Sequence, residues 1–100
     1  MASLASIGRS GMQAAQMRLD ASANNVANAN TPNYRRVAVE QEAAPDNAGT
    51  RARMERQSNE QVRLEKEAVE QISATYSFAA NLLSVKTESQ MMGTLLDERA

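Results

Sequence analysis

Apolar and small residues recur at alternating intervals of three and four along the first 29 residues, from Ala5 to Val26. This spacing places them on one stripe of a helix, with polar side chains such as Arg9 and Gln13 facing away. The stretch contains no proline, and Ser3 is a residue type that caps the start of a helix. The pattern therefore predicts a helix over residues 2–29.

A cluster of turn-forming residues follows this helix at positions 28–33. Pro32 disfavours the helical conformation at Thr31, and Asn33 tolerates a left-handed backbone. We therefore expect the chain to turn here and to enter a polar connector over residues 30–60. Residues 34–39 alternate weakly, as a short strand does, and residues 45–49 carry a turn signal. The connector is predicted to be either a small β-hairpin or a mobile loop.

A second helical pattern covers residues 61–97, without proline and interrupted only by Gly93. We predict an all-α fold in which two long terminal helices form an antiparallel hairpin or coiled coil, joined by the polar connector, within a single domain spanning residues 1–100. The second helix is longer than the first. Its Met91, Met92, Leu95 and Leu96 should therefore extend past any partner within the chain and contact other subunits.

The composition narrows the chemistry available to this chain. Its 100 residues include no His and no Cys, which removes the commonest general base, thiolate chemistry and nearly every transition-metal site. The net charge is −1, with no long basic run to follow a phosphate backbone, and no apolar run is long enough to span a bilayer. We therefore expect no enzyme activity, no cofactor, no metal, no small-molecule substrate, no nucleic-acid binding and no membrane span.

The segments "SGMQAAQMRL" and "ASANNVANANTPNYRR" resemble the flagellar axial family of rod, hook and hook-associated proteins. The matching positions are Ser10, Gly11, Met12, Ala14, Ala15, Arg18, Leu19, Ala23, Asn24, Asn25, Val26, Ala27, Asn28, Asn30, Thr31, Tyr34 and Arg35. The family usually has Gly before the Tyr, where this chain has Asn33. The resemblance implies that the turn is built by Asn24, Asn25, Asn28, Asn30, Thr31, Asn33 and Tyr34. It also implies that the asparagine amides bond backbone groups of the turn and of adjacent subunits.

The carboxy-terminal stretch from Glu65 to Glu98 resembles the closing helix of the same family. The matching positions are Glu67, Val69, Ile72, Ala74, Tyr76, Phe78, Ala80, Asn81, Met92, Leu95 and Leu96. The expected helix-packing and interface residues in the two helices are Met12, Ala15, Leu19, Val26, Val69, Ile72, Tyr76, Ala80, Asn81, Leu83, Met92, Leu95 and Leu96.

The resemblance implies a structural subunit of the bacterial flagellar basal-body rod that associates with its own copies and with other rod or hook subunits. It implies export from the cytoplasm through the flagellar type III apparatus without a cleaved signal peptide, and a final place in the periplasmic rod. The short middle segment is most like a proximal-rod subunit or a reduced paralogue. The alternative is a soluble helical adaptor or export chaperone that binds another flagellar or type III component.

Overall fold

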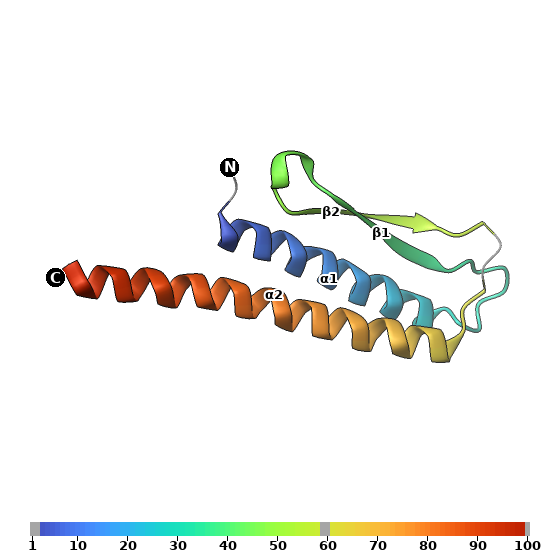
Figure 1. The fold of residues 1–100 in the computed structure, drawn as a ribbon. Helices are drawn as coiled ribbons and strands as arrows, with labels where there is room; N and C mark the ends of the chain where they lie inside the picture. Colours follow the sequence, from blue (N-terminus) through green and yellow to red (C-terminus); the bar gives the residue numbers. More distant parts are fainter. Residues whose placement is uncertain (1–2, 59–60, 100) are drawn as a thin grey trace.

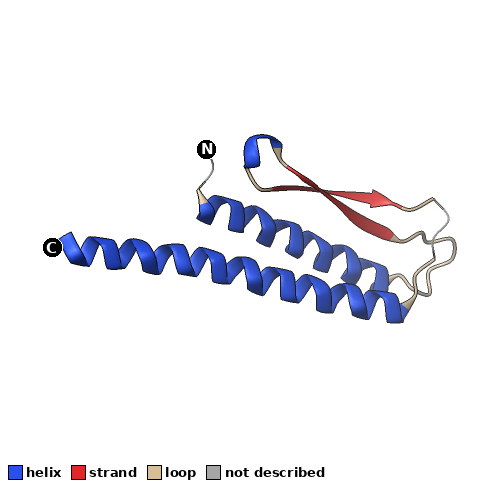
Figure 2. Ribbon diagram, in the orientation of Figure 1, coloured by secondary structure: helices blue, strands red, loops and turns tan. Residues whose placement is uncertain are grey.

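The computed structural model describes residues 3–58 and 61–99. The chain forms helix α1 (Leu4–Ala27), strand β1 (Val37–Ala43), a short 3-10 turn (Pro45–Asn47), strand β2 (Thr50–Arg56) and helix α2 (Leu64–Arg99). Helices α1 and α2 run antiparallel, and the hairpin of β1 and β2 lies on the side of α1 opposite α2 (Figures 1 and 2). Helix α1 is therefore the middle of three layers in an elongated molecule of 63 × 25 × 14 Å.

The prediction of an all-α fold is wrong in one respect, because the connector contains a two-stranded antiparallel sheet. Its register pairs Val37 with Arg56 at one end and Ala43 with Thr50 at the other. The chain reverses between the strands through Asp46 and Asn47, whose φ angles are positive, and Gly49. Of the two alternatives for the connector, the structure has the hairpin. A lone two-stranded hairpin is only marginally stable in water, so its position on α1 helps to hold it.

The turn of the hairpin is attached to the first half of α1. The Thr50 N–H donates a hydrogen bond to Ser10 Oγ at 2.9 Å, and Ser10 Oγ donates to the Ile7 carbonyl at 2.7 Å. Gly49 has a φ of 110°, and a Cβ at this position would collide with the Ser10 side chain. A glycine is therefore required here by both the backbone conformation and the close approach to α1.

Both ends of α1 follow from local signals. Ser3 Oγ accepts a hydrogen bond from the Ser6 N–H at 3.0 Å, which confirms Ser3 as the N-cap. The helix ends at Ala27, two residues before the predicted end, because Asn28 leaves the helical conformation and acts as the C-cap. Asn33 adopts the left-handed conformation expected of it, with φ of 62°.

Small residues on α1 allow α2 to approach closely. Gly8 and Ala15 are buried, seven residues apart, on the face of α1 that meets α2. A Cβ added at Gly8 would lie 2.6 Å from Val85 Cγ2 and 3.1 Å from the Asn81 carbonyl oxygen, and one at Gly11 would overlap the Asn81 amide. The glycines that weaken α1 as an isolated helix are therefore what makes this close packing fit.

The face of α2 that packs against α1 is not its most apolar face. Glu67 and Ala74 are fully buried against α1, whereas Val69, Ile72 and Tyr76 are each at least 59% exposed. The small residues of α1 bring the two backbones too close together for bulky side chains to fit between them. The larger apolar residues of α2 are left on its outer surface.

Candidate assembly site

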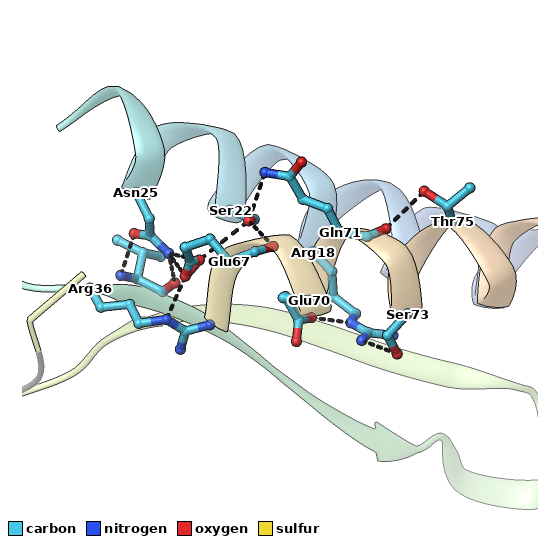
Figure 3. A network of polar contacts seen from close by, with 10 residues as sticks. Arg18, Ser22, Asn25, Arg36, Glu67, Glu70, Gln71, Ser73 and Thr75 are labelled. Atoms are coloured by element: carbon cyan, nitrogen blue, oxygen red, sulfur yellow. Dashed lines mark hydrogen bonds and ion pairs between the residues drawn. The ribbon is translucent and has the colours of Figure 1, made fainter. Parts of the chain in front are cut away.

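Four polar residues are buried together at the end of the molecule where α1 ends and α2 begins (Figure 3). Ser22 and Asn25 come from the last turns of α1, Glu67 comes from the first turn of α2, and Arg36 directly precedes β1. Their relative exposures are 1%, 0%, 0% and 7%, respectively. We call this cluster the polar junction, because it joins three elements that are distant in the sequence.

The carboxylate of Glu67 is paired through both of its oxygens. Oε1 lies 2.6 Å from Arg36 Nε and accepts a hydrogen bond from Asn25 Nδ2 at 3.0 Å. Oε2 accepts hydrogen bonds from Asn25 Nδ2 and Ser22 Oγ, each at 3.3 Å. Burying a carboxylate is costly unless it is paired with a cation and hydrogen-bonded, and Glu67 meets both conditions.

Asn25 attaches the start of β1 to the end of α1. Its Nδ2 donates to the Val37 carbonyl and its Oδ1 accepts from the Val37 N–H, both at 2.8 Å. Oδ1 also accepts a hydrogen bond from the Tyr34 hydroxyl at 3.2 Å. The side-chain amide thus offers Val37 one N–H donor and one carbonyl acceptor, as the backbone of a neighbouring strand would.

The other motif residues form the turn itself. Asn28 Nδ2 donates to the Asn24 carbonyl at 2.9 Å, and the Thr31 hydroxyl donates to Asn28 Oδ1 at 3.2 Å. Asn24, Asn30, Thr31 and Asn33 are exposed, and Tyr34 is half-buried. The guanidinium of Arg56 lies 5.2 Å from the centre of the Tyr34 ring, within the range of a cation–π interaction. The amides of Asn25 and Asn28 bond backbone groups, whereas contacts of this turn with adjacent subunits stay a prediction.

The structure gives the predicted packing residues different environments. Ala15 is buried, and Met12, Leu19 and Asn81 are half-buried. The remaining members are exposed: Val26, Val69, Ile72, Tyr76, Ala80, Leu83, Met92, Leu95 and Leu96. Packing within the chain therefore involves only part of the predicted set, and contacts between chains through the rest stay a prediction.

A groove runs along the side of the helical pair, between α1 and the outer face of α2. Its lining is mostly apolar and consists of Leu19, Ala68, Gln71, Ile72, Thr75, Tyr76 and Ala79. The stretch of α2 from Ala68 to Ala79 is about 17 Å long at the rise of an α-helix. We call this surface the lateral groove.

The last turns of α2 extend beyond α1 (Figure 1). Gly8 lies against Val85, so in an antiparallel pair the first residue of α1, Leu4, lies near residue 88 or 89 of α2. Residues 90–99 therefore form an overhang of about 15 Å. Its large apolar side chains are all at least 53% exposed: Met91, Met92, Leu95 and Leu96.

The roles of Arg36 and of the two glycines, Gly8 and Gly11, were not predicted from the sequence. Glu67 was predicted only as a position shared with the family. One signal was present in the sequence, because Ser22 and Asn25 are polar residues on the inner side of α1 and require polar partners when buried. A carboxylate close to the start of the second helix is such a partner, but its pairing with Arg36 depends on the path of the connector.

Charged side chains on the hairpin lie on its exposed face. Arg53 Nη2 lies 3.1 Å from Glu40 Oε2 and 3.6 Å from Glu55 Oε1. The pKa of Glu40 is lowered, chiefly by a hydrogen bond with Glu55 and secondly by one with Arg53. The pKa of Glu55 is raised, chiefly by its hydrogen bond with Glu40 and secondly by the negative charge of Glu40. Within residues 3–58 and 61–99, the structure contains no cluster of three or more acidic side chains that could hold a metal ion.

No helix in the described part of the chain is both long and apolar enough to span a membrane.

None of the curated proteins compared with the chain matches it. Residues 6–35 match the family model described as flagella basal body rod protein. The matched segment comprises nearly all of α1 and the turn after it, including Asn25 of the polar junction. This match confirms, over residues 6–35, the resemblance to the flagellar basal body rod family that was recognised from the sequence.

Proposed function

We propose that this chain is a structural subunit of the flagellar basal-body rod, which assembles by packing its two terminal helices against copies of itself and against other rod or hook subunits. The match of residues 6–35 to a family of structural proteins supports a rod role. The observation that carries self-association is the exposure of α2. Ten of its large apolar side chains are at least 46% exposed: Leu64, Val69, Ile72, Tyr76, Leu82, Leu83, Met91, Met92, Leu95 and Leu96.

The total surface of the chain supports assembly as well. A compact monomer of 10.9 kDa is expected to expose about 5600 Å², whereas this chain exposes 7200 Å². The difference of about 1600 Å² is about twice the area that one partner contributes to a standard specific interface. The exposed apolar side chains of α2 are part of this surface, and a large exposed apolar patch favours burial between chains.

The proposal extends to the organisation and location of the protein. Residues 1–100 act as one rod-type domain whose helical pair forms a coiled coil with neighbouring subunits. The chain leaves the cytoplasm through the flagellar type III apparatus and reaches the periplasmic part of the basal body. It acts by assembly and not as an enzyme, without a cofactor.

Sedimentation velocity of the purified chain over a hundredfold range of concentration tests the self-association. We expect the weight-average mass and the helical circular dichroism to rise together with concentration. A fully helical monomer at every concentration would contradict the proposal. A stable one-to-one complex with a single exported flagellar protein, without larger assemblies, would instead favour an adaptor or export chaperone.

Isolation of basal bodies from the bacterium that encodes the chain tests its location. We expect mass spectrometry to find the chain in intact basal bodies, at a ratio to known rod subunits that stays constant through purification. Loss of the chain at the first salt wash, while those rod subunits are retained, would argue against its incorporation into the rod.

A further inference from the structure

The direction of the backbone groups in the hairpin follows from the hydrogen bonds at its two ends. The Gln57 N–H donates to the Arg36 carbonyl at 2.8 Å. At the turn, the Ala44 N–H donates to the Gly49 carbonyl, also at 2.8 Å. In an antiparallel ladder, such hydrogen-bonded pairs alternate with pairs whose N–H and C=O groups point outward. With the register of this hairpin, the outward-pointing residues are the odd-numbered ones of β1 and the even-numbered ones of β2.

Helix α1 covers a different edge at each end of the hairpin. Near the polar junction, the Asn25 amide bonds the outward N–H and C=O of Val37 on β1. At the turn, Ser10 Oγ accepts the outward N–H of Thr50 on β2. The hairpin therefore crosses α1 obliquely, with β1 nearer to the helix at one end and β2 nearer at the other (Figure 1). The second half of β2 is left as an edge, and we call its residues 53–56 the free edge.

The free edge carries the one large apolar side chain that is exposed among the described residues of the two strands. Met54 is 48% exposed, whereas Val37 is buried and Val39 is half-buried. The Met54 N–H and C=O point outward and have no hydrogen-bond partner within residues 3–58 and 61–99. Such an edge is a template for another strand, and added strands stabilise a hairpin that is marginal by itself.

We propose that β2 pairs with β2 of a second copy, antiparallel and centred on Met54, so that two hairpins form one four-stranded sheet. This contact goes beyond the proposed packing of the terminal helices, because its backbone hydrogen bonds come from the hairpin alone. In this register, Met54 of each copy lies opposite Met54 of the other, and their outward backbone groups exchange hydrogen bonds. The two Met54 side chains meet on the same face of the sheet as the buried Val37.

The charges beside Met54 favour this register and a second copy as the partner. Arg53 and Glu55 flank Met54 and project from the other face of the sheet. Pairing centred on Met54 places Arg53 of each copy opposite Glu55 of the other, and opposite charges in this position stabilise a sheet. A shift by two residues, the smallest that keeps the outward groups paired, puts Arg53 opposite Arg53 or Glu55 opposite Glu55. The free edge is therefore complementary to itself.

The proposed contact is closed, since a two-fold axis at Met54 uses the same edge of both copies. It produces dimers and no larger species by itself. Helix α2 lies on the side of α1 opposite the hairpin (Figures 1 and 2). The contact therefore leaves the exposed apolar side chains of α2 open to other subunits, and the two kinds of association can be measured separately.

Disulfide crosslinking of the full-length chain tests the contact. The chain has no cysteine, so Met54→Cys carries a single thiol. Opposed residues of a hydrogen-bonded pair have Cα atoms about 5.5 Å apart, which is within the range of a disulfide. We expect Met54→Cys to give covalent dimers at least about tenfold above those of Arg51→Cys. Arg51 is the matched control, because it is exposed on the same strand but would lie about 20 Å from Arg51 of the second copy.

Exchange of charges provides a second measurement that does not depend on oxidation. Arg53→Glu opposes two pairs of carboxylates across the contact, and Glu55→Arg opposes two pairs of guanidinium groups. Each variant alone should dimerise at least about tenfold more weakly than wild type. In an equimolar mixture, both opposed pairs regain opposite charges, so the mixed dimer should recover an affinity within about threefold of wild type. Sedimentation velocity of the two variants and of their mixture measures this recovery.

Three results would overturn the proposal. Equal crosslinking of Met54→Cys and Arg51→Cys, in a chain whose wild type self-associates, would reject the hairpin contact and leave assembly through the helices standing. A mixture of the charge variants that dimerises no better than either alone would show that these charges do not face each other. A Met54→Cys chain that crosslinks to another rod subunit, and not to itself, would assign the free edge to that subunit.

Failure of the proposed function would look different. Dimers captured by Met54→Cys, in a wild type that forms no larger assembly at any concentration, would support the hairpin contact and count against assembly through the helices.

Discussion

The two ends of the helical pair differ in what they bury and what they expose. At the polar junction, Ser22, Asn25 and Glu67 are within 1% of complete burial, and their hydrogen bonds are made within the chain. At the other end, Met92 and Leu95 continue the same side of α2 with more than half of their surface exposed. Polar contacts that need a fixed geometry are thus completed inside the chain, whereas the apolar surface that tolerates different partners is left open.

This difference has a physical basis. A buried ion pair contributes little net stability, but it is strongly destabilising when one partner is removed, so it favours one arrangement of α1, β1 and α2 over others. Apolar burial has no such directional requirement, and methionine in particular adapts to irregular surfaces. The junction therefore determines the shape of the subunit, and the overhang is suited to contacts with neighbours that need not be identical.

The largest expected effect is that of Glu67→Ala, which removes the carboxylate bound by Arg36, Asn25 and Ser22. We expect a loss of about 3–5 kcal/mol in the free energy of unfolding, because the buried cation of Arg36 loses this countercharge. Urea unfolding followed by circular dichroism measures the change. Glu67→Gln keeps the shape of the side chain, so its loss in the free energy of unfolding should be smaller than that of Glu67→Ala.

Glu70→Ala is the matched control for that prediction. Glu70 pairs with Arg18 at 2.5 Å one turn further along α2, but its side chain is 30% exposed. Its removal should cost about 1 kcal/mol or less. Equal losses for Glu67→Ala and Glu70→Ala would show that the polar junction does not hold the closed end of the molecule together.

The next largest effect is expected for Gly8→Ala. Gly8 lies in the close contact of α1 with α2, between the polar junction and the overhang. The added Cβ would meet Val85 Cγ2 and the Asn81 carbonyl oxygen. We expect a destabilisation of about 1–3 kcal/mol despite the higher helix propensity of alanine, because overpacking a close contact forces the backbones apart. Thermal unfolding of the variant measures it, and an increase in stability would show that the close approach is not required.

Gly93→Ala should have the opposite sign, because Gly93 lies in the overhang with no heavy atom within 4 Å of an added Cβ. We expect a stabilisation of up to about 1 kcal/mol, which reflects helix propensity alone. Helical circular dichroism in dilute solution checks this. If Gly93→Ala destabilised the dilute chain, the overhang would have to pack against another part of the subunit.

The smallest effect concerns the exposed carboxylates of the hairpin, which contrast with the buried Glu67. The raised pKa of Glu55 favours folding at low pH, and this contribution is lost as pH rises through that pKa. The lowered pKa of Glu40 favours folding above its ordinary range, and this contribution is lost as pH falls. The two oppose each other, so the stability of the hairpin should change little with pH.

Carboxyl carbon shifts in an NMR titration test this prediction directly. Glu40 should titrate at a lower pH than Glu55 in the folded chain. In Arg53→Ala, the pKa of Glu40 should rise toward its ordinary range, because one of its hydrogen-bond donors is removed. Identical midpoints for Glu40 and Glu55 would show that the two carboxylates do not interact.

Much of the local structure could be predicted from the sequence because its signals are local. Ser3 caps α1, Pro32 marks the end of the first helical segment, and Asn33 takes the left-handed conformation that its residue type tolerates. The motif from Asn24 to Tyr34 was sufficient to recognise the family to which residues 6–35 match. The pairing of Arg36 with Glu67 was not predicted, since the two residues are 31 positions apart in the sequence and the path of the connector brings them together.

The amino-acid sequence by itself determined the two helices, the turn between them and an apolar stripe on each helix, because helix periodicity and turn chemistry act over a few residues. Only the tertiary structure decided which side of α2 faces α1. That choice depends on how closely two backbones approach, which the glycines of α1 and the side chain of Asn81 set together. The bulky stripe of α2 consequently remains outside, where a second chain can reach it.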